Sequence, residues 1–148
     1  MDIQHKKDLT KFIDFHSRAF STSINSIQAI VSHDDLKLEL SEIFNLLQKD
    51  WVEVKYTKGM EPGKFIENLL WPLYQGKTVL VVTDTLDFDP VVYEQLIAFR
   101  ENNRFTLTFA LGVPIAKTSS LFLLYQDRNN DKKVWNVADH VFRTEEMN

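Results

Sequence analysis

Alternating apolar and polar positions predict a strand, a helix and a second strand in the middle of the chain. In the segment 51–57, valines and a tyrosine alternate with Glu53 and Lys55, and strand side chains point to opposite faces in turn. An apolar run at helical spacing follows over 65–74, and the unbroken apolar run 77–83 is typical of a strand covered on both faces. Since parallel strands need a crossover, the pattern predicts a parallel β-α-β unit.

Upstream of this unit the pattern is less uniform. Apolar residues over 2–20 recur at helical spacing and predict a helix. The segment 24–31 fits either a helix or a short strand. Ser32 to Asp35 form a turn or cap signal, and apolar residues from Leu40 to Leu47 return to helical spacing.

Downstream, Asp89 and Pro90 predict a helix start, because the carboxylate accepts from free helix amides and proline has no N–H to leave unpaired. The helix should run through 91–102. Alternation over 105–111 predicts a half-buried strand. The segments 121–126 and 133–137 resemble a terminal hairpin around a polar turn at 127–131.

Together these elements predict one α/β domain over residues 1–148. We expect a mixed sheet of about five strands with helices on both faces and leave its strand order open. The chain has 148 residues, of which 44% are hydrophobic, which suits one core of ordinary size.

Charge and composition narrow the classes of function. The net charge of -4 argues against non-specific coating of nucleic acid, which needs clustered lysine and arginine. The chain has no cysteine, so disulfides and thiolate metal sites are excluded. No apolar stretch reaches membrane-spanning length, and the polar N-terminal segment does not resemble a signal peptide. We expect a cytoplasmic protein without membrane contact.

Glu53 and Lys55 are the first candidates for chemistry. Because they lie two residues apart on a strand, both side chains face the same way. A carboxylate there could hold a hard cation, and the neighbouring ammonium could stabilise charge on a phosphate. An opposite-charge pair on a solvated strand face would have the same spacing.

The run Val52-Glu53-Val54-Lys55-Tyr56-Thr57, followed by helix, strand, helix and strand, resembles the restriction-endonuclease-like, or PD-(D/E)xK, nuclease superfamily over about residues 51–111. The resemblance implies a mixed sheet and a Mg²⁺-dependent nuclease acting on nucleic acid. Glu53 and an upstream carboxylate, Asp34 or Asp35, would bind the metal, and Lys55 would assist the attacking water. Glu39 is a less usual substitute for the upstream carboxylate.

Other patterns carry weaker hypotheses. Asp84, Asp87 and Asp89 follow the central strand and could hold Mg²⁺, although Asp89 fits a helix cap as well. The segment 59–65 approximates a phosphate loop but is one residue short. The segment 127–131 approximates a Ca²⁺ loop but lacks its glycine. The four histidines have no zinc-ligand spacing.

A non-catalytic function is the alternative. Eleven phenylalanines and three tryptophans accompany the acidic charge. Exposed aromatic side chains flanked by carboxylates would suit a module that binds a basic protein, such as a toxin-immunity protein or an adapter. An exposed apolar patch ringed by Asp and Glu would favour this function.

Overall fold

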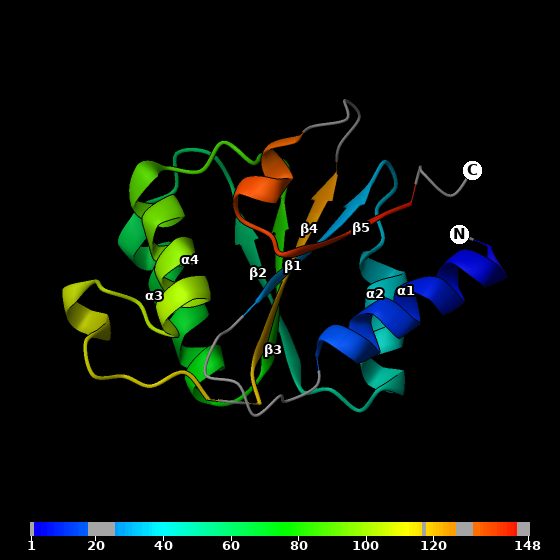
Figure 1. Cartoon of the computed structure of the whole chain (residues 1–148), viewed down its shortest axis with the longest axis horizontal. Helices are drawn as coiled ribbons and strands as arrows, with labels where there is room; N and C mark the ends of the chain where they lie inside the picture. Colours follow the sequence, from blue (N-terminus) through cyan, green and yellow to red (C-terminus); the bar gives the residue numbers. More distant parts are fainter. Residues whose placement is uncertain (1, 18–25, 117, 127–131, 145–148) are drawn as a thin grey trace.

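The computed structural model describes residues 2–17, 26–116, 118–126 and 132–144. Its centre is a single five-stranded sheet in the order β2-β3-β4-β1-β5, and all four pairings are parallel (Figure 1). The strands are β1 (Ile27–Ser32), β2 (Trp51–Tyr56), β3 (Thr78–Thr83), β4 (Ser120–Gln126) and β5 (His140–Arg143).

Helices cover both faces of the sheet, as predicted (Figure 1). On one face, α1 (Ile3–His16) and α2 (Lys37–Leu46) pack against a core that includes Leu80 and Phe122. On the other face, α3 (Pro62–Tyr74) and α4 (Pro90–Asn102) bury a larger core. The central strands β1, β3 and β4 are buried on both faces, which explains their nearly continuous apolar sequences.

The central β2-α3-β3 unit confirms the predicted parallel crossover. Val54 and Tyr56 are buried toward α3, whereas Glu53 and Lys55 are exposed on the opposite face. The α4 start is also confirmed, because the Asp89 carboxylate accepts from the amide of Val91 (2.9 Å) and Pro90 is the first helical residue.

The structure shows where the first helix begins and ends and which element lies in the segment 24–31. The first helix begins after Asp2, whose carboxylate accepts from the amide of His5 (2.8 Å), and α1 ends at His16. Residues 18–20 of the predicted helix lie outside the described residues. Residues 27–31 of the ambiguous segment form most of strand β1, in the interior of the sheet, and residues 24 and 25 lie outside the described residues.

The predicted strand over 105–111 is wrong. This segment contains only the short 3₁₀ helix η1 (Thr108–Ala110). Its first residues pack on α4 instead of pairing in the sheet: Phe105 stacks on Phe99, and Gln95 bonds both the amide and the hydroxyl of Thr106. Of the alternating apolar residues only Phe105 is buried against α4, whereas Phe109 and Leu111 are exposed, so the alternation does not mark one buried strand face.

The predicted terminal hairpin and the mixed sheet are also wrong. β4 forms where expected, but it pairs in parallel with β3 and β1. The expected partner segment 133–137 lies in the 3₁₀ helix η2 (Lys132–Asn136) and the residue after it, and β5 begins only at His140. Because β5 pairs with β1 in parallel, the sheet has no antiparallel pair among the described strands. The turn at 127–131 lies outside the described residues.

Candidate functional site

A crevice of about 300 Å³ lies at the carboxyl ends of the strands. The chain leaves β1 toward α2 on one face, and it leaves β2 and β3 toward α3 and α4 on the other face (Figure 1). Ligands of open α/β sheets bind where such connections part. The crevice is lined by Asp35, Lys37, Glu53, Lys55, Tyr56, Thr57, Val82, Thr83, Asp84, Leu124 and Gln126.

The structure brings four candidate residues together: Glu53, Lys55, Asp35 and Asp84 all line this crevice. Glu53 and Lys55 come from the edge strand β2, and Asp35 comes from the turn between β1 and α2. One oxygen of Asp35 accepts from the amide of Lys37 (3.0 Å), so this carboxylate also orders the start of α2. Asp34 is exposed and does not line the crevice.

The three aspartates after β3 are separated by their local contacts. Asp84 lines the crevice. Asp87 forms an exposed ion pair with Lys58 (3.3 Å), and Asp89 caps α4. The three carboxylates therefore lie in three different environments and do not form one group.

The segment resembling a phosphate loop is a helix cap. Glu61 accepts hydrogen bonds from the amides of Gly63 (3.0 Å) and Lys64 (2.6 Å) at the start of α3. These amides are the groups with which a helix N-terminus would bind an anion. The protein's own carboxylate occupies them, so the structure favours the turn over the phosphate loop.

The crevice does not form a ready-made metal site. Within the described ranges, no three histidine or carboxylate side chains gather closely enough to hold a metal ion. Two lysines, Lys37 and Lys55, also line the crevice and supply positive charge next to the carboxylates. The side chains present therefore do not fit a metal held by protein ligands alone.

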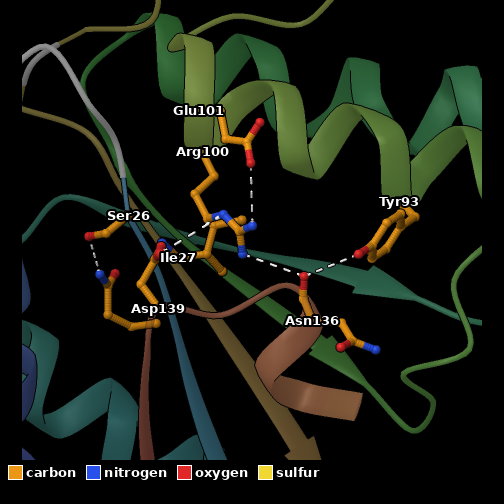
Figure 2. Close-up of polar contacts among 8 residues, drawn as sticks. Ser26, Ile27, Tyr93, Arg100, Glu101, Asn136 and Asp139 are labelled. Carbon is orange, nitrogen blue, oxygen red and sulfur yellow. Dashed lines mark hydrogen bonds and ion pairs between the residues drawn. The ribbon is translucent and has the colours of Figure 1, made fainter.

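A second, more open hollow of about 600 Å³ lies at the C-terminal end of α4. Figure 2 shows its central residue, Arg100, reaching between Glu101 (3.7 Å) and Asp139 (3.9 Å). Arg100 and Tyr93 both donate to the carbonyl of Asn136, at 3.4 and 3.3 Å. Trp135, which is 55% exposed, also lines the hollow. The hydrogen bonds to Asn136 attach η2 to α4. The charged side chains of Arg100, Glu101 and Asp139 therefore have a structural role in this hollow.

The histidines include one pair that sequence spacing could not reveal. The rings of His16, at the end of α1, and His140, at the start of β5, stack with centroids 4.0 Å apart. Burial lowers the pKa of His16 to about 4, and the neighbouring His140 adds to this effect. Phe12 packs against His16 as well (4.6 Å between ring centroids). The pair joins α1 to the edge of the sheet.

Exposed apolar side chains gather beside α3. Trp71 and Tyr74 lie on the solvent side of α3 with their rings in an edge-to-face contact (6.2 Å). Phe109 and Leu111 are exposed in and after η1, which lies next to the α3–α4 layer (Figure 1). The loop after η1 is tied to α3, because the amide of Ala116 donates to the carbonyl of Leu73 (3.0 Å).

We call Trp71, Tyr74, Phe109 and Leu111 the aromatic surface. Their exposed fractions are 47%, 49%, 44% and 62%. Among the polar residues of α3, Lys64 and Asn68 are exposed and Glu67, one turn before Trp71, is half-buried; the N-cap Glu61 is exposed as well. Large apolar side chains are therefore exposed on α3 and in and after η1, and Glu67 is the acidic residue of α3 nearest in sequence to Trp71.

Comparisons with known proteins bear on the fold. No protein-family model matches the sequence, and no curated protein matches it at a significant level. Among solved structures, the Thermotoga maritima RuvB Holliday junction branch migration motor is similar, with a TM-score of 0.61 and 10% sequence identity.

The match covers 97% of this chain and 45% of the RuvB chain, so this chain spans less than half of RuvB's length. No helix within the described residues has the length and apolar character needed to cross a membrane. The similarity and the topology together establish an α/β fold with a five-stranded parallel sheet flanked by helices.

Proposed function

We propose that this chain is a non-catalytic protein-binding module. The observation that carries the proposal is the aromatic surface, where four large apolar side chains on α3 and next to it remain exposed. Tryptophan and tyrosine are enriched among the residues that dominate binding energy at protein interfaces. Large apolar side chains left exposed are candidates for an interaction site.

The turn between β1 and α2 lacks the features of a loop that binds the phosphates of a nucleotide. A phosphate loop joins a strand to a helix through glycines and ends in Lys-Ser or Lys-Thr. Here the connection reads Ser32-His33-Asp34-Asp35-Leu36, with two exposed carboxylates and no glycine. Negative charge at this position repels phosphate, so we do not extend the motor activity named for RuvB to this chain.

Affinity capture tests the proposal. The immobilised wild type and a Trp71→Ser/Phe109→Ser variant would be exposed to lysate of the source organism, and the retained proteins quantified by mass spectrometry. A Leu46→Ser variant is the matched control, because Leu46 is exposed on the opposite face of the sheet. We expect a partner that the wild type and the control retain and that the double variant loses. Equal retention by all three proteins would contradict a role for the aromatic surface.

Mg²⁺-dependent hydrolysis of phosphodiester bonds is a second candidate. One observation favours it: Glu53, Lys55 and Asp35 line the same crevice. Mg²⁺ often binds through one or two carboxylates, with water and substrate phosphate completing its coordination. The restriction-endonuclease-like resemblance stays a hypothesis about these residues, and a cleavage assay with Glu53→Gln tests it.

A further inference from the structure

The edge strand β2 has unpaired backbone groups. β2 is the first strand in the sheet order and pairs only with β3. The amide of Thr78 in β3 donates to the carbonyl of Asp50 (2.8 Å). In a parallel pair, the N–H and C=O of one residue point to the same side and successive residues alternate. The backbone groups of Trp51, Glu53 and Lys55 therefore point away from β3, and no described residue bonds them.

The side chains along this edge are self-complementary. Glu53 and Lys55 lie on either side of Val54, and both are exposed on the same sheet face. If a second β2 pairs in the antiparallel direction with the two Val54 residues opposite each other, Glu53 faces Lys55 of the second copy and Lys55 faces its Glu53. Directly opposite charges stabilise an antiparallel pair. Many exposed edges carry lysine alone, which repels a second copy; this edge instead attracts one.

The backbone geometry agrees with this register. Residues 53 and 55 both turn their N–H and C=O groups outward, so the pairs between Glu53 and Lys55 would be the hydrogen-bonded pairs of the ladder. The two Val54 residues would form the non-hydrogen-bonded pair on the two-fold axis. The axis would stand perpendicular to the sheet, so both crevices would open on the same face of a ten-stranded sheet.

We propose that two copies of this chain associate through antiparallel pairing of their β2 edges, centred on Val54. The interface is isologous, as in most symmetric dimers. Because one strand pair buries less surface than a standard interface, we expect a reversible dimer. Exposed ion pairs are screened by salt, so dimerisation should weaken as ionic strength rises. This inference is independent of the proposed binding function.

Sedimentation equilibrium with charge-reversal variants tests the dimer. Glu53→Lys leaves the edge with two lysines, and Lys55→Glu leaves it with two glutamates. Each change converts both cross-strand pairs into like-charge pairs, so each variant alone should dimerise at least about tenfold more weakly than the wild type. An equimolar mixture of the two variants should form a heterodimer, because the two-lysine edge matches the two-glutamate edge. The double variant Glu53→Lys/Lys55→Glu should dimerise like the wild type.

A backbone variant gives a second measurement. Lys55→Pro removes an N–H that points outward and leaves the ladder with β3 intact, so it should abolish the dimer while circular dichroism stays unchanged. Recovery in the mixture shows that the single variants are folded. A wild type that stays monomeric at millimolar concentration would overturn the proposal. So would single variants that dimerise as tightly as the wild type, or a mixture that fails to pair.

Discussion

At the scale of single residues, the buried side chain of Gln95 holds the segment after α4 in place. Gln95 is 2% exposed, and its carbonyl accepts from the amide of Thr106 (2.7 Å). We expect Gln95→Leu to lower the free energy of unfolding by about 1–3 kcal/mol, because it removes the acceptor of that amide. Urea unfolding measures the change.

Thr106→Val is the matched control for this prediction. It removes only the hydroxyl that Gln95 bonds and keeps the backbone amide paired. Its effect should be smaller than that of Gln95→Leu. Equal losses in the two variants would show that the side-chain contact, and not the amide, carries the stability.

His16 gives the molecule a predicted dependence on pH. The fold lowers the pKa of His16 to about 4, whereas its ordinary value is 6.5. Between these values the unfolded chain binds a proton that the folded chain does not, so stability rises with pH through this window. The contribution of His16 is complete above pH 6.5 and is lost as the pH falls toward 4.

Guanidinium unfolding at several pH values across the window checks this dependence. In a His16→Phe variant, which keeps an aromatic ring beside Phe12 and His140, the slope of stability against pH should flatten. An unchanged slope in His16→Phe would refute the assignment to His16.

At the scale of elements, local signals placed the helix starts. Asp89 and Pro90 mark the start of α4 in the sequence, and the cap is present. We expect Asp89→Ala to destabilise the protein by about 0.5–2 kcal/mol, because it leaves helix amides uncapped. Asp87→Ala removes a carboxylate two residues away that forms only an exposed ion pair, so it should cost about 1 kcal/mol or less. Thermal unfolding of both variants tests the difference.

Elements whose patterns depend on distant partners were not predictable. In the segment 105–111, Phe105 packs on Phe99 and Thr106 bonds Gln95, both in α4, while Phe109 and Leu111 stay exposed, so the alternation does not correspond to a buried strand face. The segment 24–31 could not be assigned by periodicity, since a central strand buried on both faces has no polar side.

At the scale of the whole molecule, strand order decides what the site contains. Glu53 and Lys55 could be placed on one face from sequence, because their relation is local. Of the two upstream aspartates considered, Asp35 lines the same crevice, whereas Lys37 and Gln126 were missed, since only the order β2-β3-β4-β1-β5 brings them there. The stacked pair of His16 and His140 was missed for the same reason: the two residues meet only through the packing of α1 on the edge of the sheet.

If the proposed protein-binding function is right, the crevice that contains Glu53 does not carry out metal-dependent catalysis. The most direct measurement is titration calorimetry with Mg²⁺ and Mn²⁺ on the wild type and Glu53→Gln, combined with cleavage assays on plasmid DNA and RNA. We expect the same heats for both proteins and no cleavage by either. Metal binding and cleavage by the wild type that are both lost in Glu53→Gln would contradict this expectation and establish a nuclease.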